Sequence, residues 1–358
     1  MAFDYKTHTL DASSGLSDNI IKAQHAAVDT EFIRQSTYYP KVGLIQLATR
    51  DDSYVFDPMD SGIECLRSFL LNRSIAKIMH ASRQDIDIFV HQLRIVPAPL
   101  IDTQILAEFC GFEANISLDA LSQHFFEMSL DKSYQRLNWL KRPLPAKALV
   151  YAHEDVQVTY RCFEKLQEMA DHKYAWFLED MAEMEKPTFY QETPESLFKK
   201  FKKQTRSLTS AQAVVLKRIL VIRDLVAAKL NRAVRYILED DVCMEICQSD
   251  LAKQKMSEVM KGLTEKFHEV KKADFLDWNE GIIDEVFKRE ISAPEKEEGN
   301  INKNHVQELQ QKLAVTAEQN QITPSLLARK RDIIEALRDF PTSRLSKGWR
   351  APLVQSLF

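Results

Sequence analysis

Short apolar runs alternate with helix-like spacing along the front half of the chain. Runs rich in Val, Ile, Leu and aromatic residues, bounded by turn-type clusters, predict strands at 26–32, 43–49, 53–56 and 76–81. Only a few polar residues separate the first three runs, which favours an antiparallel meander over successive βαβ crossovers. Further on, helical spacing follows residue 81, and a short strand ending near residue 101 precedes a helix over 103–110. The pattern predicts an α/β domain with a mixed sheet flanked by helices.

Only helical patterns follow in the rest of the chain. Residues 147–185 predict one long helix that ends before Pro187, and a polar, lysine-rich linker comes next. Beyond that linker one apolar stripe is marked by Val215, Ile219, Ile222 and Val226. We therefore expect residues 1–187 to form the α/β domain, 188–207 a basic linker, 208–287 an all-α domain, 288–304 a second linker, and 305–358 a second all-α domain.

Composition places the chain among ordinary globular proteins. Of its 358 residues 45% are hydrophobic and 28% charged, which excludes wholesale disorder and fibrous repeats. We expect no membrane span and no secretory signal, because no apolar run approaches the ~18–20 residues that a span needs. Five cysteines without paired metal spacing are expected to be reduced thiols of a cytoplasmic protein. Cys243 and Cys247, one helical turn apart, are a weaker alternative as a metal pair.

The charge is distributed unevenly. Residues 1–195 hold 19 Lys and Arg against 29 Asp and Glu, and residues 196–358 hold 29 against 23. The excess peaks at 199–238, where eleven Lys and Arg accompany a single acid, Asp224. An acidic front half and a basic stretch behind it suit a catalytic body joined to a module that binds nucleic acid. A solvated charged face is the alternative for such a run.

Four acids of the front half fall where a site is expected. Asp29 and Glu31 lie two apart at the end of a predicted strand, so their side chains share one face. Asp85 follows another strand, and Asp155 lies one helical turn after Tyr151, so that hydroxyl and carboxylate share a face. Buried acids need compensation, and a set of ligands with neither His nor Cys favours Mg²⁺ or Mn²⁺ over zinc.

These residues stand in segments that resemble the ribonuclease D family. DTEF at 29–32 with TYYPKVGLIQLA at 37–48 resembles its first exonuclease motif, HASRQD at 80–85 its second, PLIDTQILAEFCG at 99–111 its mid-domain signature, and YAHED at 151–155 its third. RDLVAAKLNRAVRYILEDD at 223–241 is similar to the helicase-and-RNase-D C-terminal (HRDC) domain. ITPSLLARKRDIIEAL with KGW at 347–349 is similar to the terminal helical unit of bacterial ribonuclease D. The resemblance covers nearly the whole chain in the family's order.

The resemblance implies a ribonuclease-H-like exonuclease domain of the DEDD superfamily, in the subclass with a tyrosine in the third motif, followed by two HRDC-type domains. It implies that Asp29, Glu31, Asp85 and Asp155 bind two divalent ions and that Tyr151 orients the attacking water. The implied activity is 3′–5′ exoribonuclease trimming of tRNA precursors and other structured RNA, with release of nucleoside 5′-monophosphates. We also expect the protein to be a monomer.

Further residues are candidates for RNA contact. Aromatic faces stack on bases and amides bond ribose hydroxyls, which makes Phe32, Tyr39 and Gln46 candidates, although packing inside the domain accounts for them equally well. Phosphate contacts are expected from the basic residues behind the exonuclease domain, namely Lys199, Lys200, Lys202, Lys203, Arg206, Arg232 and Arg235. Docking of another protein is the alternative role for this basic module.

Several residues are expected to have structural roles. The sequence also departs from the family at two places. We expect Asp102 to cap a helix, His80 to be structural, and His153 to be structural or solvent-facing. Leu137-Asn138 and His153-Glu154 replace residues usual in the family, which puts in question the loop packing and substrate preference near the site.

Two other functions remain open from the sequence. A non-catalytic RNA-binding or scaffold protein on an exonuclease fold is disfavoured because all four acids and the tyrosine are intact. A DNA exonuclease of the same superfamily shares the metal chemistry and differs in recognition of the 2′-hydroxyl.

Overall fold

The computed structural model describes residues 3–10, 16–59, 62–201, 204–266, 272–293 and 302–358. The chain divides into two compact units. The first comprises Met1–Ile33, Lys41–Tyr190 and Glu298–Phe358, and the second comprises Arg34–Pro40 and Gln191–Glu297. Among the described residues, no helix has both the length and the apolar character required to cross a membrane.

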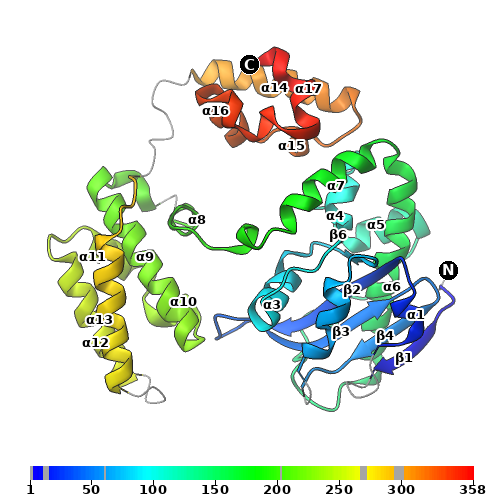
Figure 1. Ribbon diagram of the computed structural model, residues 1–358, viewed down its shortest axis with the longest axis horizontal. Coiled ribbons are helices and arrows are strands. Elements are labelled where there is room, and N and C mark those ends of the chain that lie inside the picture. Colours follow the sequence, from blue (N-terminus) through cyan, green and yellow to red (C-terminus); the bar gives the residue numbers. More distant parts are fainter. Residues whose placement is uncertain (1–2, 11–15, 60–61, 202–203, 267–271, 294–301) are drawn as a thin grey trace. The chain divides into compact units, whose positions relative to one another are not determined.

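A mixed sheet is the centre of the first unit (Figure 1). Its strands, in chain order, are β1 (Lys6–Leu10), β2 (His25–Ile33), β3 (Lys41–Ala48), β4 (Asp52–Phe56), β5 (Ala76–Met79) and β6 (Leu100–Asp102). Their spatial order is β1-β4-β3-β2-β5-β6. The predicted antiparallel meander is confirmed by the pairing of β2 with β3 and of β3 with β4, while β5 and β6 continue the sheet in parallel.

Strand β1 was not predicted from the sequence. It pairs in parallel with β4 at one edge of the sheet and is largely exposed. Its sequence, KTHTL, contains one apolar residue, because a largely exposed edge strand needs few. Hydrophobic patterning therefore carries no signal for it.

Helices of the first unit cover the sheet. They are α1 (Asp18–Ile21), α2 (Arg67–Leu71), α3 (Arg83–Leu93), α4 (Thr103–Phe109), α5 (Leu118–Phe126), α6 (Ala146–Ala170) and α7 (Lys173–Met184). Helix α6 packs across β2, β3 and β4, and in Figure 1 it runs along the sheet. The single helix expected over 147–185 is two helices, because Asp171 between α6 and α7 has a positive φ of 47° that ends the first one.

The C-terminal residues also belong to the first unit. They form α14 (Lys303–Gln319), α15 (Pro324–Leu327), α16 (Lys330–Arg338) and α17 (Ala351–Val354). The Trp349 ring is stacked on Trp176 of α7 at 5.2 Å and meets Phe109 of α4 edge-on at 5.4 Å. Nearby, Arg350 donates two hydrogen bonds of 2.7 Å to the carboxylate of Asp180. These contacts make the C-terminal helices part of the same hydrophobic core as the sheet.

The second unit is helical. Its helices are α8 (Pro194–Lys199), α9 (Ser210–Leu230), α10 (Val234–Ile237), α11 (Asp240–Cys247), α12 (Ala252–Lys266) and α13 (Lys272–Lys288). Helix α9 begins at a capping box formed by Thr209 and Gln212. Most of the stripe predicted from the sequence, Ile219, Ile222 and Val226, is fully buried.

The described part of the segment expected as a polar linker, 188–207, is partly helical. Leu197 of α8 and Phe201 are buried in the core of the second unit. The buried Leu197 and Phe201 anchor a helical turn among the lysines. Composition alone does not separate such a turn from a linker.

Candidate active site

Strand β2 carries two of the four candidate acids on one face. Ala26, Ala27 and Val28 are buried and hold the strand in the core, and Asp29 and Glu31 follow at alternate positions. In the register with β3, Asp29 lies opposite Gln46 and Glu31 opposite Leu44, and the ladder shifts between Glu31 and Phe32. The alternation along the strand thus fixes both carboxylates on one face of the sheet.

Helix α6 brings the third acid to this face. One carboxylate oxygen each of Asp29, Glu31 and Asp155 lies within 4.8 Å of the others. Among the described residues, no other group of three or more His, Cys, Asp and Glu side chains is placed to hold a metal ion. The structure therefore brings together three of the four acids that the sequence singled out.

Asp85 stands beside that group and not within it. It lies in the first turn of α3, directly after β5, and is 6% exposed. Its Oδ1 accepts a hydrogen bond from the hydroxyl of Thr30, the residue between the two acids of β2. Burial and the nearby charge of Asp29 raise its pKa well above the ordinary value. The contact with Thr30 places Asp85 next to the strand that carries Asp29 and Glu31.

The four carboxyl groups repel one another in a buried setting. Burial raises the pKa of Asp155 to about 7, and the charge of Asp29 adds to the effect. Burial also raises the pKa of Asp29 to about 6 and raises the pKa of Glu31, the latter further through the charges of Asp29, Asp155 and Asp85. No ion pair among the described residues offsets these charges. A cluster of buried oxygen ligands without a cationic partner fits divalent cations of the Mg²⁺ or Mn²⁺ type.

Tyr151 completes the group. It lies one helical turn before Asp155 on α6, and burial together with the charges of Asp155 and Glu31 raises its pKa above the ordinary value. Its ring packs between Tyr134, at 5.9 Å, and Trp139, at 6.2 Å. The hydroxyl therefore stays protonated and can donate a hydrogen bond beside the acids.

The residues proposed for nucleotide contact have different surroundings. Phe32 is partly buried against the core of the first unit. Tyr39 belongs to the second unit, where its backbone N–H donates to the side chain of Asn231. Gln46 is 0% exposed, and its amide nitrogen and oxygen have no hydrogen-bond partner among the described residues. Gln46 is therefore enclosed in the sheet opposite Asp29.

Many of the basic residues already have partners inside the second unit. Lys200 pairs with Glu192 at 2.8 Å, and Arg235 donates to the backbone oxygen of Gln35 at 3.0 Å. Lys217 and Arg223 of α9 are buried and pair with acids. Lys199 and Arg232 also make interactions, Lys202 and Lys203 lie outside the described residues, and so does the side chain of Arg206.

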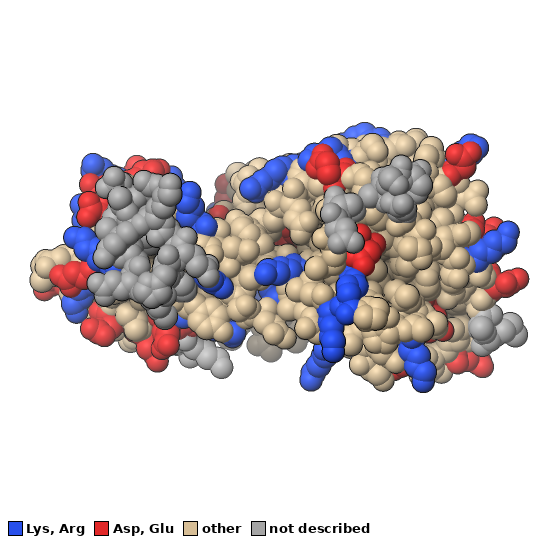
Figure 2. All heavy atoms as spheres, turned by 90° about the horizontal axis from the view of Figure 1, so that it is seen from below, with Lys and Arg blue, Asp and Glu red and all other residues tan. Residues whose placement is uncertain are grey.

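The surface carries charges of both signs. Figure 2 shows basic and acidic side chains interspersed on the face it displays, among the residues described there. The count of positive residues in the sequence therefore overstates the positive charge that is free on the surface.

Three residues with bland interpretations act as expected. Asp102 caps α4 by accepting hydrogen bonds from the backbone of Gln104 and Ile105, and it also holds the backbone of Ser82. His80 is hydrogen-bonded to Thr103. His153 is buried and hydrogen-bonded to Ser53 at 2.7 Å, so it is structural and not solvent-facing.

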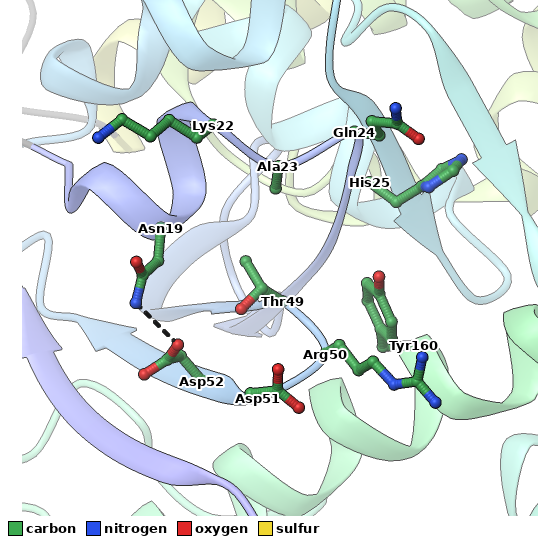
Figure 3. A pocket seen from close by; sticks show the side chains of 10 residues that line it. All are labelled: Asn19, Lys22, Ala23, Gln24, His25, Thr49, Arg50, Asp51, Asp52 and Tyr160. Carbon is green, nitrogen blue, oxygen red and sulfur yellow. Dashed lines mark hydrogen bonds between the residues drawn. The ribbon is translucent and has the colours of Figure 1, made fainter.

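A hollow of about 490 Å³ lies elsewhere on the first unit (Figure 3). Its lining includes His25 at the start of β2 and Thr49 directly after β3, so it lies at the opposite end of these strands from Glu31. Its two strong cations are paired, Lys22 with Asp18 and Arg50 with Glu164. The hollow therefore does not coincide with the acidic cluster.

Thr30 is the site residue that sequence reasoning missed. A threonine in a strand ordinarily signals only strand propensity. Its contact with Asp85 joins residues 55 positions apart, which no local pattern reveals.

Comparison with known proteins gives a consistent result. Residues 7–171 match a family described as 3′–5′ exonuclease. The chain is 30% identical over 340 residues to ribonuclease D of Nitrobacter hamburgensis, covering 91% of this chain and 86% of that protein. It is 32% identical over 244 residues to ribonuclease D of Bartonella henselae, covering 67% of this chain and 59% of that protein.

A solved structure is similar over almost the whole chain. The crystal structure of Escherichia coli RNase D, described as an exoribonuclease involved in structured RNA processing, aligns with a TM-score of 0.77 and 24% identity. The alignment covers 99% of this chain and 97% of that one. The likeness confirms the predicted fold, a mixed sheet flanked by helices with a helical C-terminal part.

Proposed function

The chain belongs to the ribonuclease D family of 3′–5′ exoribonucleases, and from this premise we propose that it trims the 3′ ends of tRNA precursors and other structured RNA. The products are nucleoside 5′-monophosphates. The observation that carries the proposal is the group of carboxylates of Asp29, Glu31 and Asp155, with Asp85 and Tyr151 beside it.

Two divalent cations, Mg²⁺ or Mn²⁺, fit this group. Asp29, Glu31 and Asp155 would hold one ion, and Asp85 with Asp29 would hold the second. Ions bound there lower the pKa of a water molecule and stabilise the charge that develops on the leaving 3′-oxygen. Repulsion between the acids, visible in their raised pKa values, supports an affinity for cations.

The chain's own residues contribute position and hydrogen bonds. The Tyr151 hydroxyl keeps its proton, so it can bond the oxygen of the attacking water and fix the direction of its approach. The rings of Trp139 and Tyr134 limit the movement of that hydroxyl. Tyr151 needs no ionisation for this role.

The helical parts supply RNA binding in this proposal. Residues 208–287 and 305–358 would act as HRDC-type domains, and basic residues including Lys199, Arg232 and Arg235 would contact phosphates. Phe32 would meet the terminal nucleotide by stacking. We further propose that the protein acts as a cytoplasmic monomer; its five cysteines are free thiols, as a reducing compartment favours.

A precursor tRNA with a short 3′ trailer tests this function. The expected result is removal of the trailer nucleotide by nucleotide, with each product recovered as a 5′-monophosphate. Binding of the precursor without cleavage in Mg²⁺ or Mn²⁺ would support the alternative, a non-catalytic RNA-binding protein on the same fold.

A further inference from the structure

Thr30 lies between the two acids of β2, and its side chain points to the opposite side of the strand from theirs. It is 5% exposed, and its hydroxyl donates a hydrogen bond to Oδ1 of Asp85. Asp85 is the acid that lies outside the three-carboxylate group. The hydroxyl of Thr30 therefore contacts the acid that lies outside the group of Asp29, Glu31 and Asp155.

A neutral donor suits this position. Asp85 is buried close to Asp29, and repulsion between like charges favours rotation of one carboxylate away from the other. A hydrogen bond from Thr30 to Oδ1 of Asp85 opposes that rotation. Thr30 leaves the second oxygen of Asp85 available to a metal ion. A lysine at this place would neutralise Asp85 and compete with a cation, whereas a hydroxyl holds the group and preserves its charge.

The alternation of side chains along β2 explains why Thr30 meets Asp85. Asp29 and Glu31 must share one face of β2, so the residue between them necessarily projects on the other face. Strand β5 is the parallel neighbour of β2, and Asp85 follows it at the first turn of α3. The middle position of the motif is thereby placed next to the acid that comes from α3.

We propose that Thr30 is a positioning residue for the second divalent cation: it holds Oδ1 of Asp85 so that the other carboxylate oxygen faces the ion shared with Asp29. This inference rests on the proposed function, since it concerns the same pair of ions. Removal of a group that orients a metal ligand typically weakens metal binding about 10- to 100-fold.

The full-length chain carries the test. Mn²⁺ is titrated by calorimetry into wild type, Thr30→Val and Thr30→Ser at a fixed concentration of uridine 5′-monophosphate, with a blank that lacks protein. Valine keeps the shape of threonine and the preference for a strand, whereas serine keeps the hydroxyl. Asp85→Asn is the reference that lacks the ligand itself.

The expected result is two Mn²⁺ ions for wild type and for Thr30→Ser. Thr30→Val is expected to bind the first ion with unchanged affinity and the second about 10- to 100-fold more weakly. Its cleavage rate should recover at high Mg²⁺, which a general loss of structure would not permit. If Thr30→Val does not fold, Thr30→Ala carries the same prediction.

Two results would contradict the role of Thr30 without affecting the proposed two-ion site. One is a Thr30→Val protein that binds both ions as tightly as wild type. The other is a Thr30→Ser protein that loses the second ion to the same degree as Thr30→Val. A wild type that binds a single Mn²⁺ would instead contradict the proposed two-ion site, and this inference with it.

Discussion

Tyr151 and Asp155 lie one turn apart on α6, and the charge of Asp155, which belongs to the acidic cluster, helps to raise the pKa of the tyrosine above its ordinary value. A phenol in this position faces charges that oppose its ionisation. In the proposed reaction it would therefore act as a neutral donor, which separates its contribution from that of the acids.

Tyr151→Phe tests this separation. The substitution keeps the ring that packs between Trp139 and Tyr134 and removes only the hydroxyl. We expect kcat to fall about 100-fold, which corresponds to about 2.7 kcal/mol, with little change in Mn²⁺ affinity or melting temperature. Because burial and the nearby charges raise the pKa of Tyr151, the wild-type rate should show no tyrosine ionisation between pH 8 and 10. Loss of the second Mn²⁺ ion in the variant would contradict this role.

Asp155→Asn is expected to separate binding from cleavage. The amide keeps the shape of the side chain but lacks the charge of a metal ligand, so cleavage should fall about 1000-fold or more, equivalent to about 4 kcal/mol. RNA affinity, measured by fluorescence anisotropy, should stay within about threefold. The control is Glu154→Gln, the neighbouring acid on α6 that is not part of the cluster, which should cleave normally. Cleavage by Asp155→Asn at the wild-type rate would refute the site.

Without metal, the acidic cluster should make stability depend on pH. The folded pKa of Asp155, about 7, lies above the value near 4 of an unfolded aspartate, so the folded protein holds this proton more tightly. Its contribution to stability is complete below about pH 4 and is lost as the pH rises through 7. Thermal unfolding in EDTA should therefore show a lower free energy of unfolding at pH 8 than at pH 5.5, by about 1–2 kcal/mol.

Two controls accompany the pH experiment. Saturating Mg²⁺ should remove the loss at pH 8, because ions that bind only the folded state stabilise it. Asp155→Asn should flatten the dependence in EDTA. Equal slopes for wild type and Asp155→Asn would mean that the carboxyl group is not destabilising.

Trp349 should stabilise the exonuclease unit although it lies near the C-terminus. It is 3% exposed and packs on Trp176 and Phe109. Trp349→Ala is expected to cost about 3–5 kcal/mol in urea unfolding. Leu178→Ala, at an exposed position of α7, is the control and should change stability by less than about 0.5 kcal/mol. Similar losses in both variants would show that the tryptophan does not belong to this core.

Much of the fold follows from local patterns. The strands of the meander, the stripe of α9 and the cap at Asp102 are encoded by residues within a few positions of one another, so the sequence predicts them. Position on the alternating face of β2 likewise places Asp29 and Glu31 together, and helical spacing pairs Tyr151 with Asp155.

Other features depend on distant partners. The contact of Thr30 with Asp85 and the full burial of Gln46 opposite Asp29 arise from strand pairing and helix packing. The same is true of Lys217 and Arg223, which a charge count assigns to the surface but the structure buries against acids. Residue type does not distinguish these environments, since each depends on what the rest of the chain places nearby.

The most direct test follows a 5′-labelled RNA with a single-stranded 3′ tail in Mg²⁺, in Mn²⁺ and in EDTA, beside DNA of the same sequence. We expect a ladder of products shortened one nucleotide at a time from the 3′ end, dependent on the metal and absent for DNA. Unshortened RNA in both metals, or a ladder that persists in EDTA, would contradict the claim that these carboxylates form the active site of a metal-dependent exoribonuclease.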